Sequence, residues 1–185
     1  MKVNFENERG YIDDPKERGA VLWLAKDTLK AHLIKCTSFR AGSLALMPSD
    51  IPYLEEMGVL VDSSVAPNAD YRMFVDWQGA PNDPYHSDKA DLTKKGNNGI
   101  LHLPLATHNG LHGYLDHPMA QLLPLFEANL NREVLTLAAR DYMDSTENLI
   151  ATIQYFRNQG SHFTTMTQAA SEHYEHHGAL MTAGV

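Results

Sequence analysis

One stretch, residues 37–64, constrains the fold more than any other part of the chain, because it reads as strand, helix and strand. A short apolar run ends at Arg40 and a second ends at Asp62, and each is typical of a short buried strand. Ser49 predicts the start of the intervening helix and Gly58 its left-handed end. Both strands therefore deliver polar residues to the carboxyl edge of a sheet, where α/β proteins build their sites.

The rest of the chain continues this alternation. Short apolar runs predict strands near residues 36–39, 59–62, 100–105, 134–138 and 162–165. Helix starts are predicted at Asp14-Pro15, Ser49, Pro118, Asp144 and about Gln168. Strands that alternate with helices predict an α/β fold with a mainly parallel sheet. We expect residues 1–185 to form a single domain, with residues 1–13 and 178–185 poorly ordered.

The composition excludes some functions. The net charge is −8, which argues against nucleic acid, because binding of nucleic acid needs a basic face. No apolar run is long enough to span a bilayer, and the polar start of the chain shows no apolar signal core. The single cysteine, Cys36, can form no internal disulfide. We therefore expect a cytoplasmic protein without a membrane partner.

The strand ends supply the first candidate site residues. A guanidinium at Arg40 can hold a carboxylate in two-point geometry, or it can form an ordinary salt bridge at the rim. Asp62, with Ser63 and Ser64 beside it, can line a sugar site or support Arg40. The same three residues also fit a simple turn that ends the strand. Both interpretations stay open from these residues alone.

Two groups of histidines could hold a metal. The first is His102, His108, His112 and His117. Gly110 and Gly113 make a helix unlikely there, so the spacing of His108 and His112 is weak evidence for a metal site, whereas His102 lies on a predicted strand. The second group is His173, Glu175, His176 and His177. Tyr174 interrupts the HExxH pattern, so we expect a structural role for this group and predict no metal ligands.

Several short segments resemble one known family. They are Phe39-Arg40-Ala41-Gly42, Met57-Gly58, Asp62-Ser63-Ser64, Asp76-Trp77, Pro84-Tyr85, Leu103-Pro104-Leu105 and Phe156 to Met166. Their order and spacing, from about Leu22 to Ala170, resemble the later half of the polysaccharide deacetylase (NodB-like) superfamily. The resemblance implies a partial or irregular (β/α) barrel, and a hydrolase that acts on the carbon–nitrogen amide bonds of N-acetylated carbohydrate.

The resemblance also implies roles for residues. Arg40 and Asp62 would be catalytic, with Arg40 orienting an aspartate base. Ser63, Ser64, His102 and Arg140 would bind substrate, and Arg140 stands near the position of the family's general-acid histidine. A divalent metal, zinc, is implied too. Its ligands belong to motifs upstream of Arg40, and we find neither Thr-Phe-Asp-Asp-Gly nor His-x-x-x-His there.

Two alternatives follow from that departure. The chain can be a degenerate, non-catalytic member that binds carbohydrate or a partner chain, or its own cluster from His102 to His117 can hold a metal. Because half a barrel exposes sheet edges, we also expect a homo-oligomer or an N-terminal segment that completes the barrel.

Overall fold

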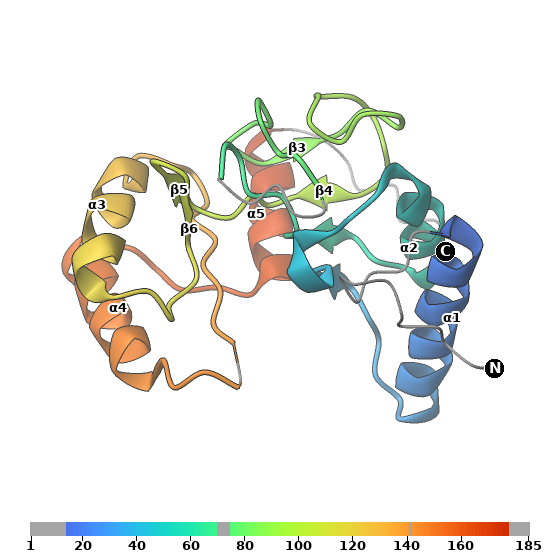
Figure 1. Cartoon of the computed structure of the whole chain (residues 1–185), viewed down its shortest axis with the longest axis horizontal. Coiled ribbons are helices and arrows are strands. Elements are labelled where there is room, and N and C mark those ends of the chain that lie inside the picture. Colours follow the sequence, from blue (N-terminus) through green and yellow to red (C-terminus); the bar gives the residue numbers. More distant parts are fainter. Residues whose placement is uncertain (1–13, 70–74, 141, 178–185) are drawn as a thin grey trace.

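The computed structural model describes residues 14–69, 75–140 and 142–177, so the poorly ordered ends expected from the sequence lie outside the described residues (Figure 1). The main sheet has the order β1-β2-β4-β3. Its strands are Ser38–Phe39 (β1), Val61–Asp62 (β2), Tyr85–His86 (β3) and Leu101–His102 (β4). β1, β2 and β4 run parallel and β3 runs antiparallel to β4. Three predicted strands therefore lie side by side in parallel, as the sequence indicates.

The last two predicted strands differ from expectation. Residues 134–138 contribute only isolated parallel bridges, which pair Thr136 with Leu105 and Ala138 with Tyr114. The strand predicted at 162–165 is wrong, because these residues are an irregular approach to a helix. Thr165 caps that helix, since its hydroxyl accepts a hydrogen bond from the Gln168 N–H (3.2 Å). The described sheet stays open, with β1 and β3 at its edges, and the barrel stays a prediction.

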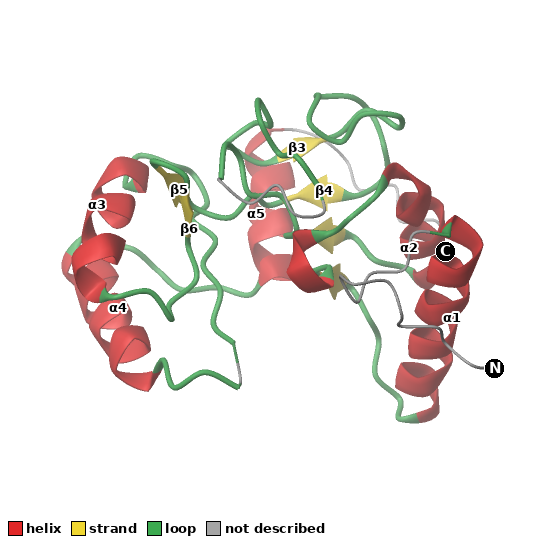
Figure 2. Ribbon diagram, in the orientation of Figure 1, coloured by secondary structure: helices red, strands yellow, loops and turns green. Residues whose placement is uncertain are grey.

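Helices lie at both ends of the molecule and against the main sheet (Figure 1). They are Pro15–Ala31 (α1), Ile51–Met57 (α2), Met119–Asn129 (α3), Thr146–Asn158 (α4) and Met166–His177 (α5), with short 3₁₀ turns at Gly42–Leu44 (η1) and Pro48–Asp50 (η2). α1 and α2 lie at one end of the molecule, α3 and α4 at the other, and α5 packs against the middle of the sheet (Figures 1 and 2). The predicted helix signals at the start of α1 and the end of α2 are confirmed. The Asp14 carboxylate accepts a hydrogen bond from the Lys16 N–H (2.7 Å), and Gly58 is left-handed with φ 83°.

Among the described residues, the hydrophobic core forms three clusters. One surrounds Trp77, whose indole N–H donates to the Leu44 carbonyl oxygen (3.2 Å). A second joins α3 to α4 through Phe126 and Phe156, whose ring centroids are 5.0 Å apart. In the third, buried residues of α5 pack on β2 and β4, namely Ala169 and Ala170 on Val61, Leu101 and Leu103. Helix α5 therefore packs against the sheet and supports it. The parallel pairing of β1, β2 and β4 brings the carboxyl ends of these strands to the same edge.

A second, two-stranded sheet was not anticipated. Thr107–His108 (β5) pairs antiparallel with Leu111–His112 (β6), within the segment where the glycines argued against a helix. Asn109 and Gly110 form its turn, with φ 48° and φ 80°. Asn-Gly is the most favourable pair for a two-residue hairpin turn, because both residues tolerate positive φ. The hairpin places the histidines of this segment on a defined backbone.

Candidate functional site

Arg40 lies directly after β1, beside the carboxyl end of β2. Its Nε donates a hydrogen bond to the carbonyl oxygen of Ser63 (3.0 Å), and its Nη2 donates to the Ser63 hydroxyl (2.6 Å). Burial lowers the pKa of Arg40, while the nearby Tyr114 and Asp62 favour its charged form. A guanidinium stays protonated in such surroundings. No carboxylate among the described residues forms an ion pair with Arg40, so its charge is balanced at longer range.

Asp62, the last residue of β2, is fully buried and holds three strands' ends together. Its Oδ2 accepts from the Ser64 N–H (2.9 Å) and lies 3.0 Å from His102 Nδ1 on β4. Its Oδ1 accepts from the Ser64 hydroxyl (2.5 Å), which itself accepts from the Ala41 N–H (2.8 Å) after β1. The carboxylate thereby fixes the carboxyl edge to which Arg40 belongs.

His102 extends this network to Ser87. Its Nε2 is 3.0 Å from the Ser87 hydroxyl, which also accepts a hydrogen bond from the Asn98 amide. The order Asp62, His102, Ser87 matches the connectivity of a catalytic triad, in which the carboxylate bonds to Nδ1 and the serine to Nε2. Asp62, His102 and Ser87 are all fully buried, however. A nucleophile must reach its substrate, so this network orders the sheet edge and does not attack a bond.

The zinc that the resemblance implies does not fit the residues of this edge. Both carboxylate oxygens of Asp62 and both ring nitrogens of His102 have hydrogen-bond partners inside the protein. Neither side chain is exposed, so neither can turn toward an ion without breaking the network. We therefore derive no chemical step from a metal at the carboxyl edge.

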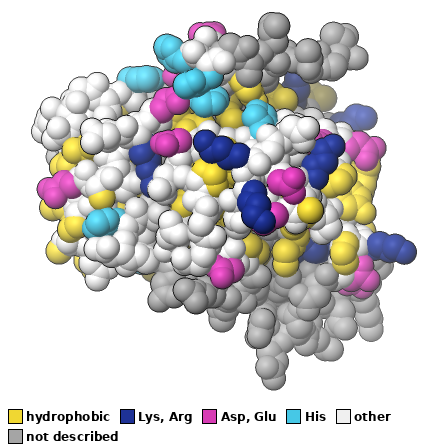
Figure 3. All heavy atoms as spheres, turned by 90° about the horizontal axis from the view of Figure 1, so that it is seen from above, with side chains coloured by type: hydrophobic (Ala, Val, Ile, Leu, Met, Phe, Trp, Pro, Cys, Tyr) yellow, Lys and Arg dark blue, Asp and Glu magenta, His cyan; other side chains and the backbone are white. Residues whose placement is uncertain are grey.

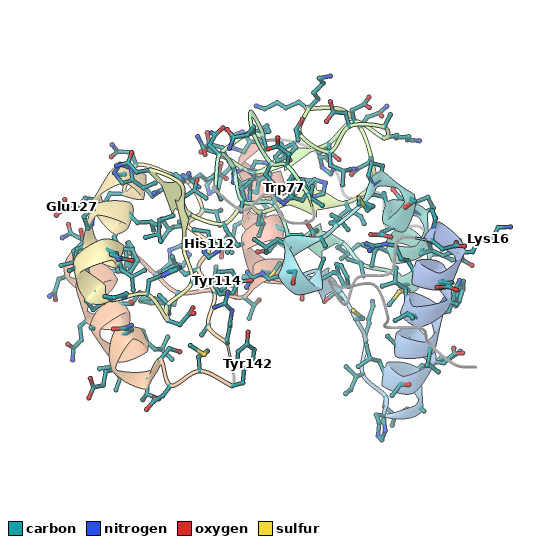
Figure 4. The ribbon with its side chains drawn as sticks, viewed as in Figure 1. Lys16, Trp77, His112, Tyr114, Glu127 and Tyr142 are labelled. Atoms are coloured by element: carbon teal, nitrogen blue, oxygen red, sulfur yellow. The ribbon has the colours of Figure 1, made fainter. Side chains whose placement is uncertain are left out.

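A second cluster surrounds Tyr114, which follows the β5–β6 hairpin. The Arg140 guanidinium lies 4.3 Å from the centre of the Tyr114 ring and forms an ion pair with Asp116. The His112 ring lies 4.9 Å from that of Tyr114, and its Nδ1 is 3.4 Å from His117 Nε2. Figure 4 shows His112 and Tyr114 side by side, facing the centre of the molecule. Tyr114 thus belongs both to this cluster and to the surroundings of Arg40.

Electrostatics in this cluster favour a neutral imidazole. Burial lowers the pKa of His112, and the neighbouring His117 and Arg140 lower it further. A neutral imidazole hydrogen-bonded to a second imidazole can accept a proton near neutral pH and pass it on. The sequence analysis named Arg140 as a substrate-binding candidate, and it considered His112 and His117 only as members of a possible metal cluster.

An open pocket of about 410 Å³ lies where the chain continues beyond β2 and β4. Its walls are rich in amides and include Asn68, Asn82, Asn109, Asn129, Asn131, Asp83 and Arg132. The Arg132 Nη2 donates to the Asn82 side-chain oxygen (3.0 Å). The Asn129 amide nitrogen donates to two backbone carbonyls, and its buried Oδ1 has no partner within the described part of the chain. Amides and an ordered guanidinium are groups that recognise hydroxyls and acetamides.

One side-chain cluster was missed by the sequence analysis. Glu133, which precedes the 134–138 segment, lies against His173 and His177 of α5. The search for HExxH required the acidic residue next to a histidine, whereas this glutamate comes from a distant part of the chain. The spacing of His173 and His177 alone, one helical turn apart, was the signal that could have pointed to a shared face.

Comparison with known proteins adds no functional assignment. Neither the family models, nor the curated proteins, nor the solved structures that were compared with the chain gave a match. Within the described ranges, no helix has both the length and the apolar character needed to cross a bilayer.

Proposed function

We propose that this chain is a polysaccharide-deacetylase-like hydrolase that acts on the amide carbon–nitrogen bonds of N-acetylated carbohydrate. The observation that supports it is Arg40. It lies at the shared carboxyl edge of β1 and β2 and bonds to Ser63, next to Asp62. The sequence resemblance implies a catalytic arginine at this strand end, where the matching arginine of the family orients an aspartate base.

In this proposal the role of each residue follows from whether its side chain is exposed to the ligand or buried. Arg40 uses two N–H groups on Ser63, and its remaining N–H groups hold the acetamide oxygen of the ligand. Asp62 is buried, so it positions Ser64 through its carboxylate and does not touch the sugar.

We assign proton transfer to the leaving amine to the pair His112 and His117. Arg140 stands near the place of the family's general acid, but a guanidinium does not release its proton near neutral pH. His112 and His117 lie beside Arg140 and can exchange a proton between their rings. We assign them this role: water adds to the acetamide carbon and gives a proton to the pair, the pair delivers a proton to the amine nitrogen as the carbon–nitrogen bond breaks, and acetate leaves, with Arg140 and Asp116 fixing the charge around the pair.

The test is an acetate-release assay on a chitin hexamer, run with and without added zinc. We expect release by the unaltered chain, and a loss of about a hundredfold in Arg40→Ala, because misplacing a bound group by an ångström costs that much. Arg40→Lys should lose nearly as much, since an ammonium cannot bond to both atoms of Ser63. Arg157→Ala, an exposed arginine of α4, is the matched control. Equal rates in the Arg40 and Arg157 variants would refute the assignment.

A second candidate is a non-catalytic domain that binds carbohydrate. It is supported by the amide-lined pocket and by the burial of Asp62 and His102, which leaves no acidic residue of the network open to a ligand. Binding of the hexamer without acetate release would favour this candidate. In that case Arg132→Ala, which removes one wall of the pocket, should weaken binding more than Arg40→Ala does.

A further inference from the structure

We propose that Glu133, His173 and His177 form a binding site for one divalent transition-metal ion of the zinc class. The three residues offer one carboxylate and two imidazoles, and the atoms that would bind the ion all lie within 4.8 Å of one another. The site shares no residue with the Arg40 edge, so it stands apart from the proposed hydrolase function.

Helix α5 sets the spacing of the two imidazoles. His173 and His177 are four residues apart, which places them one above the other on the same face of a helix. Their ring centroids are 4.5 Å apart. Histidines in this arrangement can both direct a nitrogen to one point beside the helix, as in helical zinc sites.

Glu133 closes the site from the opposite side. Its Oε1 lies 2.9 Å from His173 Nδ1, and its Oε2 lies 3.1 Å from His177 Nε2. Two ligand atoms bound to one tetrahedral zinc, each at about 2.0–2.1 Å, are separated by about 3.3 Å. The two carboxylate–imidazole distances are therefore already close to those between ligands of one ion, and the atoms that would bind it all lie within 4.8 Å of one another.

Accessibility and ligand type select the ion. The side chains are 15% exposed for His173, 35% for Glu133 and 56% for His177, so an ion from solvent can reach the site and retain a water. Two imidazoles with one carboxylate suit zinc, cobalt and nickel, whereas magnesium and calcium prefer oxygen ligands only. Figure 3 shows histidines gathered beside acidic side chains at one margin of the surface.

The bound ion would have a structural consequence. Glu133 directly precedes Val134, which packs in the same cluster as Ala169, Ala170 and Tyr174 of α5. A metal held between Glu133 and the last turn of α5 would attach the end of that helix to the segment it covers. Because α5 supports β2 and β4, zinc should stabilise the whole sheet.

The experiment is a zinc titration of the full chain against a chromophoric chelator of known affinity. We expect one equivalent of zinc, and at least tenfold weaker binding in Glu133→Gln and in His177→Ala, since even partners of a ligand are worth ten- to a hundredfold. His176→Ala is the matched control, because this histidine is an exposed neighbour on α5 outside the cluster. His177 is largely exposed, so its loss should leave the fold intact, as circular dichroism would verify.

A second readout uses the stability of the chain. Zinc at about a hundredfold above its dissociation constant should raise the Tm by roughly 5–10 °C for a domain of this size, and the rise should be at most about half as large in the two variants, which bind zinc at least tenfold more weakly. Cobalt should give the absorption bands of a tetrahedral site. The proposal would be overturned if the unaltered chain bound no stoichiometric zinc, if the Glu133 and His177 variants bound zinc as tightly as the unaltered chain, or if His112→Ala lost zinc instead.

Discussion

Replacing Asp62 by alanine tests the buried network most severely. The substitution removes the acceptor of three hydrogen bonds, from the Ser64 N–H, the Ser64 hydroxyl and His102 Nδ1. Water cannot replace the carboxylate, because Asp62, Ser64 and His102 are fully buried. Each orphaned polar group costs about 1–3 kcal/mol. Allowing for partial relaxation, we expect Asp62→Ala to lower the free energy of unfolding by about 3–5 kcal/mol, similar to breaking a buried ion pair.

The measurement is urea unfolding followed by circular dichroism. With a urea dependence of about 2 kcal/mol per molar, the loss should move the midpoint down by roughly 2 M. Asp62→Asn should fall between the native chain and Asp62→Ala, because an amide keeps the shape and one acceptor oxygen. Asp27→Ala, at an exposed position on α1, should stay within about 0.5 kcal/mol.

The reasoning would be refuted by a loss below about 1 kcal/mol in Asp62→Ala, since that is the cost of a single ordinary hydrogen bond. It would also fail if Asp27→Ala and Asp62→Ala lowered the midpoint equally. Either result would show that the carboxylate does not hold the carboxyl edge together.

Two further predictions concern packing and pH. Gly19→Ala should destabilise the chain by about 1–3 kcal/mol, because the added Cβ would lie 2.4 Å from the Tyr53 ring, whereas Gly42→Ala meets no atom within 4 Å and should be neutral; thermal unfolding of both variants checks this, and equal Tm values would contradict it. Burial and the charge of Arg140 hold the pKa of His112 below its unfolded value, so the folded state favours the neutral ring and stability should fall as the pH drops below about 6.5. His112→Gln should flatten this dependence between pH 7.5 and 5.5, and an unchanged slope would count against the pKa argument.

Local signals in the sequence predicted the parts of the fold that depend on neighbouring residues. Asp14 and Gly58 mark helix ends through their own side-chain and backbone chemistry, so both positions were correct. The place of Arg40 beside Ser63 also followed from local order, because two parallel strands joined by a helix must end at one edge.

Features that depend on distant partners were less accessible. Thr164 and Thr165 have strand-like side chains, but no strand in the described part of the chain pairs with them, and Thr165 serves as a helix cap. The hairpin at Asn109-Gly110 did have a local signal, which the high glycine and histidine content obscured. Glu133 meets His173 only through the packing of α5, so no spacing along the sequence predicts that contact.

The most direct measurement of the central claim is the affinity for a chitin hexamer, followed by backbone amide shifts during titration. We predict shifts at Arg40, Gly42, Ser63 and Tyr114, tighter binding of the N-acetylated hexamer than of its deacetylated form, and binding at least tenfold weaker in Arg40→Ala, the loss expected when a guanidinium hydrogen bond to a ligand is removed. Equal affinity for both hexamers, or shifts confined to the walls of the pocket around Arg132, would contradict the assignment of Arg40 to the substrate edge.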